Sequence, residues 1–410
     1  YTITVDAGKI VDAYGNATLS DSVFTWTRDI TPPTIAITAS LSDGTSVANE
    51  TVSKDSPLVL TLISSSSATG FVVGDIVITN DGTDIGDTSG VLSSFDSSNN
   101  PTYSVTFTPT SDGVYTFKVL ANSFTDSAGN NNSVSNTITW TYDTTRPTAS
   151  LTYSPVGPYK QGTNVTVSIT CNETMSALNA DIPTITLTDG ASSDFVTDAV
   201  MTETSTANIF TYIFTCPAGD GTGTVTLGAG KDIVGNDIVV TPTTGSTFVI
   251  DNISPTGAIT YSQDSSTTPY HQGDSGVTIT ATFSESIRST VLPKIKITGD
   301  TISDVPLTQM VRINATEFTY TYTIPSGTGT GTIELHTATD FAGNVVTTTP
   351  TSGATFSVNN TKPSMAITAD WVNSGQTTNV TSSTVTFTSS EATSDFDVND
   401  VIVKKDGVEV

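Results

Sequence analysis

Short runs in which apolar and polar residues alternate recur along the whole chain. The segment 164–171 reads NVTVSITC, with apolar side chains at every second position, and the segments 209–216, 276–283 and 317–324 alternate in the same way. A period of two residues predicts β-strands that bury one face and expose the other. We therefore expect an all-β chain of short, mainly antiparallel strands.

The composition agrees with this pattern. Serine and threonine make up roughly a third of the 410 residues. Threonine is both β-branched and polar, which suits the solvated face of a sheet. Only 13% of the residues are charged, while 36% are apolar. That apolar share, gathered in strand-like runs, is too high for a disordered chain.

Two signatures repeat and divide the chain. The motif D-x-x-G-N begins at Asp12, Asp126, Asp232 and Asp340, at intervals of 114, 106 and 108 residues. A polar segment with a proline follows each motif, at Pro33, Pro147, Pro255 and Pro363. Proline holds the backbone extended and stops strand pairing, so we interpret these segments as joints between domains. The predicted domain boundaries are 1–30, 31–144, 145–252, 253–360 and 361–410.

The first and last of these segments are predicted to be parts of domains, and the middle three to be whole. Each whole domain holds about seven short strands in about 110 residues, which is typical of an immunoglobulin-like β-sandwich. We expect tandem immunoglobulin-like sandwiches arranged as an extended rod. We also expect the chain to be a window of a longer tandem protein.

Several strings carry a family resemblance. GPYKQG and GDGTGTVTL in the third domain return as TPYHQG and SGTGTGTIEL in the fourth, and the fifth begins in the style of the second, with VTFTSSEATSDFDVNDVIV. These strings resemble the bacterial immunoglobulin-like domain families that occur in tandem in large secreted adhesins and cell-surface proteins. The resemblance covers essentially the whole chain. It implies an extracellular stalk or adhesin, often stabilised by calcium.

The charge balance excludes two classes of partner. The chain has 40 acidic and 14 basic residues, which gives a net charge of −26. A nucleic-acid-binding protein needs a basic face, and an anionic membrane surface repels an acidic chain. No apolar run is long enough to span a membrane, so we expect no direct membrane insertion. The partners that we expect are the neighbouring domains, further copies of the chain, and a glycan or cell surface.

Acidic residues are predicted to meet at the joints. In this topology the joint Asp, the acidic residue after strand B and the D-x-x-G-N turn share one end of each sandwich. The third domain contributes Asp143, Glu173, Asp232 and Asn236, and the fourth contributes Asp251, Glu285, Asp340 and Asn344. Clustered carboxylates repel one another unless a cation neutralises them, and Ca²⁺ takes six to eight oxygen ligands. The pattern predicts calcium sites that resemble the cation-stiffened joints of cadherins and repetitive bacterial adhesins.

A plainer interpretation of the same residues stays open. The D-x-x-G-N motif is also typical of a turn in which Asp accepts backbone N–H groups and glycine supplies a positive φ. Two joints depart from the acidic pattern: Ser67 stands where the second domain should have Glu, and Asn359 replaces Asp at the last joint. We expect those joints to bind a cation weakly or not at all.

The remaining reactive residues indicate little chemistry. Cys171 is predicted to end strand B and Cys216 to end strand E, at opposite ends of the sandwich, so we expect two buried free thiols and no disulfide. His271 stands where Lys160 stands in the sister domain, which argues against a shared function for either. The sequence shows no zinc-spaced Cys/His cluster and no nucleophile motif, so we expect no enzyme.

These patterns together indicate a structural role. We expect an extracellular or cell-surface repeat region that serves for extension, adhesion or assembly into a filament or surface layer. The alternative is a binding module whose exposed top loops recognise a glycan or a host surface.

Overall fold

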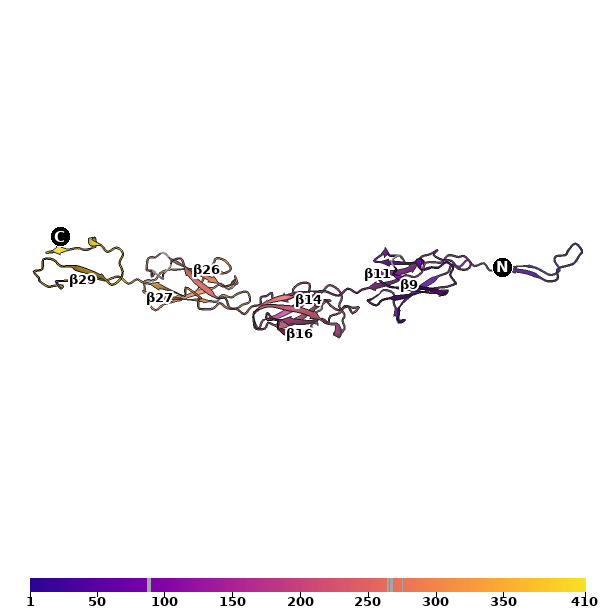
Figure 1. Cartoon of the computed structure of the whole chain (residues 1–410), viewed down its shortest axis with the longest axis horizontal. Coiled ribbons are helices and arrows are strands. Elements are labelled where there is room, and N and C mark those ends of the chain that lie inside the picture. The colour runs from indigo at the N-terminus through magenta and orange to yellow at the C-terminus, as the bar shows by residue number, and fades with distance from the viewer. Residues whose placement is uncertain (87–89, 264, 266–267, 275) are drawn as a thin grey trace. The chain divides into compact units, whose positions relative to one another are not determined.

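A computed structural model describes residues 1–86, 90–263, 265, 268–274 and 276–410. The described chain divides into two compact units. The first unit comprises residues 1–156, 164–215 and 222–248, and the second comprises residues 157–163, 216–221 and 249–410. The predicted domain boundaries are not tested by this division and stay a prediction. Figure 1 labels β9 and β11 in the second sandwich, β14 and β16 in the third, and β26 and β27 in the fourth.

The third sandwich has the strand order of an immunoglobulin fold. One sheet has the order β13-β14-β18-β17 and the other β16-β15-β19-β20, which in immunoglobulin lettering are A-B-E-D and C′-C-F-G. The strands are β13 Ala149–Ser154, β14 Asn164–Cys171, β15 Thr184–Thr188, β16 Asp194–Val200, β17 Thr202–Glu203, β18 Ile209–Thr215, β19 Gly221–Gly228 and β20 Thr247–Ile250. The B–C and F–G connections therefore leave the same end of the sandwich.

The second sandwich has two five-stranded sheets, with the orders β4-β3-β6-β10-β9 and β5-β12-β11-β7-β8. Its short β5 pairs in parallel with β12, the last strand of the sandwich. The strands are β3 Ile35–Leu41, β4 Ser46–Val47, β5 Thr51–Ser53, β6 Leu58–Ser64, β7 Ile76–Asn80, β8 Thr83–Asp84, β9 Leu92–Asn99, β10 Thr102–Phe107, β11 Gly113–Val119 and β12 Ile138–Tyr142.

The fourth sandwich repeats the order of the third, as β21-β22-β26-β25 and β24-β23-β27-β28. Its strands are β21 Gly257–Tyr261, β22 Val277–Phe283, β23 Lys294–Thr298, β24 Val305–Gln309, β25 Val311–Arg312, β26 Glu317–Tyr322, β27 Gly329–His336 and β28 Thr355–Val358. The first segment of the chain contains β1 Thr2–Val5 and β2 Ser22–Thr25, and the last contains β29 Met365–Ala369, β30 Val385–Ser389, β31 Lys404–Lys405 and β32 Val408–Glu409.

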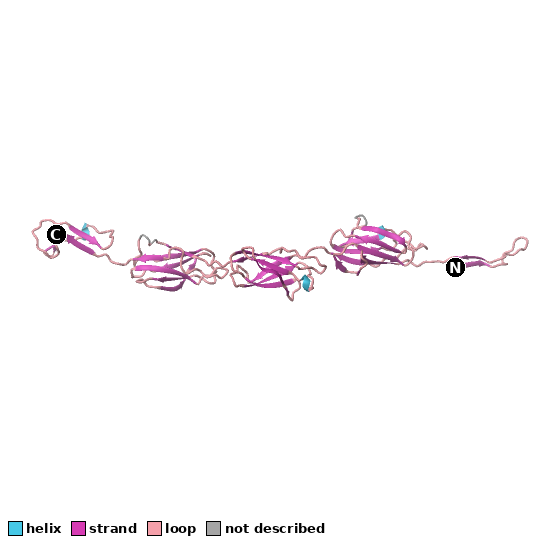
Figure 2. Cartoon of the chain, turned by 60° about the horizontal axis from the view of Figure 1, so that its bottom comes forward, coloured by secondary structure: helices cyan, strands magenta, loops and turns pink. Residues whose placement is uncertain are grey.

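Helices are short in the described part of the chain. They are the 3-10 turns η1 Val73–Asp75, η3 Asn179–Asp181 and η4 Val398–Asp400, drawn in cyan among the magenta strands of Figure 2. None of the described helices is long and apolar enough to cross a membrane. The predicted all-β, immunoglobulin-like fold class is confirmed.

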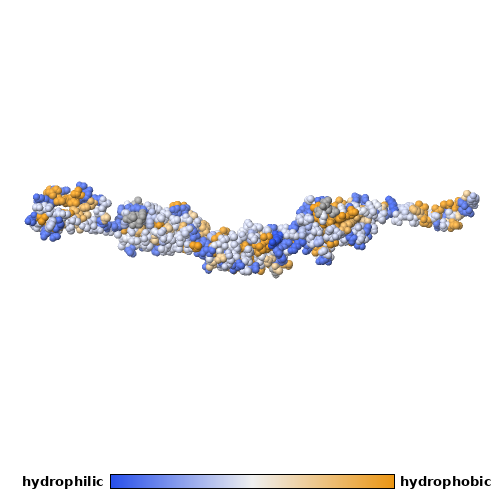
Figure 3. Space-filling view, in the orientation of Figure 1, coloured by the Kyte–Doolittle hydropathy of each residue, from blue (hydrophilic) through white to orange (hydrophobic). Residues whose placement is uncertain are grey.

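The predicted alternation decides which side chains form the cores. On β14, Val165, Val167 and Ile169 are fully buried, whereas the residues between them are not. The second sandwich adds a cluster of aromatic rings around Phe107, which lies 4.8 Å from Phe117, centroid to centroid. The two end segments contain only two-stranded sheets, and many of their apolar side chains are exposed, visible in orange in Figure 3.

The cysteines are free and buried, as predicted. β14 and β18 run antiparallel, with Thr170 opposite Ile209 and Asn164 opposite Thr215. Cys171 therefore lies at one end of this strand pair, and Thr215, which precedes Cys216, lies at the other. Burial raises the pKa of both thiols to about 11.

Candidate metal centres at the sandwich joints

The D-x-x-G-N motif folds as a tight hydrogen-bonded turn between strands F and G. In the third sandwich, Asp232 accepts the backbone N–H groups of Val234 at 2.9 Å and of Asn236 at 2.8 Å. The Asn236 side chain donates to the second carboxylate oxygen of Asp232 at 2.8 Å. Asp232 is only 1% exposed, so the turn is part of the packed end of the sandwich. These bonds agree with the interpretation of the motif as a turn. They do not prevent the Asp232 carboxylate from also facing the joint.

The same asparagine also ties the turn to the joint. The Asn236 amide donates to the backbone carbonyl of Asp143 at 3.2 Å, and the Asn344 amide donates to that of Asp251 at 2.8 Å. Asn130 makes the corresponding bond to Asp29 at 3.3 Å. Sequence reasoning had treated Asn236 and Asn344 as cation ligands and had missed this positioning role. That they also ligate a cation stays a prediction.

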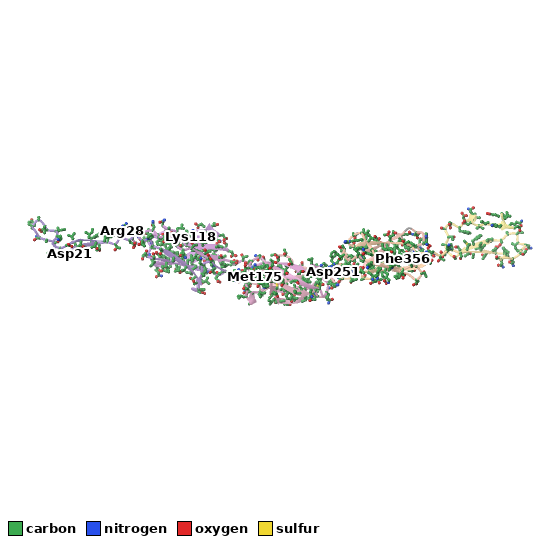
Figure 4. All side chains as sticks on the ribbon, turned by 180° about the vertical axis from the view of Figure 1, so that it is seen from behind. Asp21, Arg28, Lys118, Met175, Asp251 and Phe356 are labelled. Carbon is green, nitrogen blue, oxygen red and sulfur yellow. The ribbon has the colours of Figure 1, made fainter. Side chains whose placement is uncertain are left out.

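Three carboxylates converge at each of two joints, as the topology predicted. One oxygen each of Asp143, Glu173 and Asp232 lies within 4.8 Å of the others, and Asp251, Glu285 and Asp340 form a matching group. We call these groups the first and second carboxylate trios. Each trio lies within one compact unit. Asp251, labelled in Figure 4, lies on the connection between β20 and β21.

Each trio draws its members from three parts of the fold. The joint Asp follows the last strand of one sandwich, and the Glu follows strand B of the next. The third member opens the F–G turn of that next sandwich. The convergence is therefore a product of the immunoglobulin topology, which brings the B–C and F–G connections to the end where the chain enters.

Burial and mutual repulsion act on the glutamates. Burial, followed by the charges of Asp143 and Asp232, raises the pKa of Glu173 above its ordinary value. The pKa of Glu285 is raised in the same way, by burial and then by the charges of its two partners. The Oε1 atom of Glu173 is buried and accepts no hydrogen bond from the described residues. Among those residues, no trio carboxylate forms an ion pair with Lys, Arg or His.

The last joint shows how an amide changes this arrangement. Asn359 replaces the joint Asp, and its side-chain amide donates to the Oε2 atom of Glu391 at 3.2 Å. Glu391 therefore faces an N–H donor, whereas Glu173 faces two carboxylates. At this joint the glutamate thus has a hydrogen-bond donor in the joint residue itself.

The second sandwich corrects one prediction. Ile35 lies opposite Ser64, as Ala149 lies opposite Cys171, so the residue two positions later, Ser66, occupies the place of Glu173. The predicted Ser67 is one residue too far along, because the strand register and not the run of serines defines the position. The buried Oγ of Ser66 has no hydrogen-bond partner among the described residues.

The geometry of each trio fits a hard divalent cation. Three oxygens that lie within 4.8 Å of one another have a common centre no more than about 2.8 Å from each, close to the Ca²⁺–oxygen distance of about 2.3–2.6 Å. Three carboxylates supply up to six oxygens and three negative charges. The trios contain no histidine or cysteine, so the ligands are those that Ca²⁺ prefers over Zn²⁺.

No family model matches the chain, and no curated protein matches it. Among solved structures, the Escherichia coli adhesin FdeC is similar, with 11% identity, a TM-score of 0.34, and 82% of this chain and 100% of that chain covered. A segment of titin is 10% identical with a TM-score of 0.25, covering 78% of this chain and 99% of its own. An S-layer protein is 14% identical with a TM-score of 0.18, covering 93% and 68%. The fold assignment rests on the strand orders described above.

Proposed function

We propose that this chain is a structural repeat region of an extracellular or cell-surface protein, in which calcium ions stiffen two of the joints between sandwiches. The region would act as a stalk or extender of a large adhesin, surface filament or surface layer. The ions would bind at the first trio, between the second and third sandwiches, and at the second trio, between the third and fourth.

The contrast between joints is the observation that carries this proposal. Where the joint residue is Asp, the glutamate lies among carboxylates and its pKa is raised. Where the joint residue is Asn, the glutamate accepts an amide hydrogen bond. Carboxylates that repel one another, among them Glu173 with a buried oxygen that has no donor among the described residues, are costly, and a bound cation reduces that cost. The acidic joints therefore present clustered carboxylates whose charge a bound cation would neutralise.

The surface of the chain supports the same role. The net charge of −26 keeps the chain soluble and disfavours nucleic acid. The outward positions of strands such as β14 and β22 are filled by threonine, serine and asparagine. A polar, β-branched exterior suits a repeat that must remain folded in contact with solvent along its length.

Small-angle scattering of the whole chain in calcium and in EDTA tests the proposal. We expect a narrower distribution of intramolecular distances in calcium, because joints that lose the ion become flexible. Identical scattering and identical thermal unfolding in both conditions would leave the trios as ordinary features of the turns and would remove the calcium part of the proposal.

A further inference from the structure

At two joints, the ammonium group of a lysine donates a hydrogen bond to the D-x-x-G-N turn of the following sandwich. The Nζ of Lys54 donates to the backbone carbonyl of Gly235, and the Nζ of Lys160 donates to that of Gly343 at 2.9 Å. The partners lie 181 and 183 positions apart in the sequence. Each contact lies within one compact unit.

The two lysines occupy the same place in the fold. Lys54 directly follows β5, which pairs in parallel with β12, the last strand of its sandwich. Lys160 directly follows Tyr159, which forms a parallel bridge to Ile250 at the end of β20. Each lysine therefore leaves its sandwich beside the joint Asp and reaches the next sandwich from there. Two independent examples of one geometry indicate a recurring contact.

The glycine of the turn lies next to the end of the docked lysine. A Cβ on Gly235 would lie 3.3 Å from the Nζ of Lys54, and a Cβ on Gly343 would lie 3.7 Å from the Nζ of Lys160. Both glycines have positive φ values, 87° and 93°. At Gly129, in the turn of the second sandwich, no described residue other than the two chain neighbours lies within 4 Å of such a Cβ. The glycine has a positive φ in all three turns, and a lysine side chain ends beside it in two of them.

We propose that the D-x-x-G-N turn is a docking site for a lysine ammonium group of the preceding sandwich, and that Lys54 and Lys160 are the residues that dock. The ammonium group is a charged donor and the turn carbonyl is its acceptor, a combination stronger than a neutral pair. Docking needs no cation, so it acts on the joint separately from the trios.

The fourth sandwich has a histidine at the position of the docking lysine. His271 follows Tyr270, which forms the same parallel bridge, to Val358. Its Nε2 atom lies 3.2 Å from Asp274 in its own loop. The exchange of Lys160 for His271, which in the sequence argued against a shared function, coincides with Asn359 at the joint. Among the described residues, the joints at Asp143 and Asp251 each have both a trio and a docked lysine.

Distance measurements between spin labels on the second and third sandwiches of the whole chain test the docking. The variant Lys54→Met keeps the aliphatic stem and removes the ammonium group. We expect the docked population to fall about tenfold relative to the undocked one, the factor that corresponds to the lower end of the net contribution of a hydrogen bond to a charged group. The loss should be the same in EDTA and in calcium. Lys118→Met, on β11 and labelled in Figure 4, is the matched control and should change nothing.

The sister variant makes the test specific to one joint. Lys160→Met should broaden the distances between the third and fourth sandwiches and leave those between the second and third unchanged. An unchanged distribution in Lys54→Met, or equal broadening in the Lys118→Met control, would overturn the proposal. Because the effect is measured in EDTA, this result is independent of whether calcium binds at the trios.

Discussion

Replacing Glu173 by glutamine removes one negative charge from the first trio and preserves the shape of the side chain. Two unit charges 4.8 Å apart repel each other by about 3 kcal/mol at an effective dielectric constant of about 20. Glu173 and Asp143 are only partly buried, so solvent screening reduces this energy. We expect Glu173→Gln to stabilise the chain in EDTA by about 1 kcal/mol.

The same substitution should have the opposite effect in calcium. A bound ligand stabilises the folded state by about 2.7 kcal/mol when its free concentration is a hundred times Kd. Glutamine offers one neutral oxygen in place of a carboxylate, so the first trio should lose most of that stabilisation. The variant should therefore have a higher unfolding temperature than the wild type in EDTA and a lower one in calcium.

Isothermal titration calorimetry and scanning calorimetry measure both effects on the whole chain. With two trios, the wild type should bind two calcium ions, and Glu173→Gln and Glu285→Gln should each bind one. Glu391→Gln is the matched control, because that glutamate already accepts an amide hydrogen bond, and it should still bind two. Wild-type protein that binds no calcium, or a variant whose stability changes equally in both conditions, would refute the reasoning.

Three further outcomes follow from the structure. Both thiols should resist a thiol reagent in folded protein at pH 8, because burial raises their pKa to about 11. After unfolding without reductant, two thiols per chain should react. If no thiol reacts after unfolding, the cysteines are not free. Asn236→Ala should destabilise the third sandwich by about 1–2 kcal/mol in thermal melts, since its amide bonds both Asp232 and the Asp143 carbonyl, and an unchanged melt would show that the tie is unimportant. Hydrogen bonds from Asn130 lower the pKa of Asp126. The contribution of the Asp126 carboxylate to stability should therefore be present above the unfolded-state pKa of about 3.9 and be lost as the pH falls through the lower pKa of the folded state. An NMR titration midpoint of Asp126 at or above the ordinary value would contradict this.

The strands and their buried faces could be predicted from the sequence because they depend on local pattern. In NVTVSITC, the alternation that places Val165, Val167 and Ile169 on one side is a property of neighbouring residues, and the structure buries those three. The repeat of D-x-x-G-N identified the F–G turn because the turn closes on itself, with Asp232 and Asn236 four positions apart. Even the trios could be anticipated, since the topology of a sandwich assigns each loop to one end.

The remaining features of the joints depend on side chains that the fold brings together from distant positions. Strand register assigns Ser66, and not Ser67, to the position of Glu173. The sequence could not do so, because its four successive serines have no feature that distinguishes them. The bond between Asn359 and Glu391 and the docking of Lys54 on Gly235 join residues 32 and 181 positions apart. No local pattern encodes such a contact, because it exists only when two sandwiches meet at a joint of defined geometry.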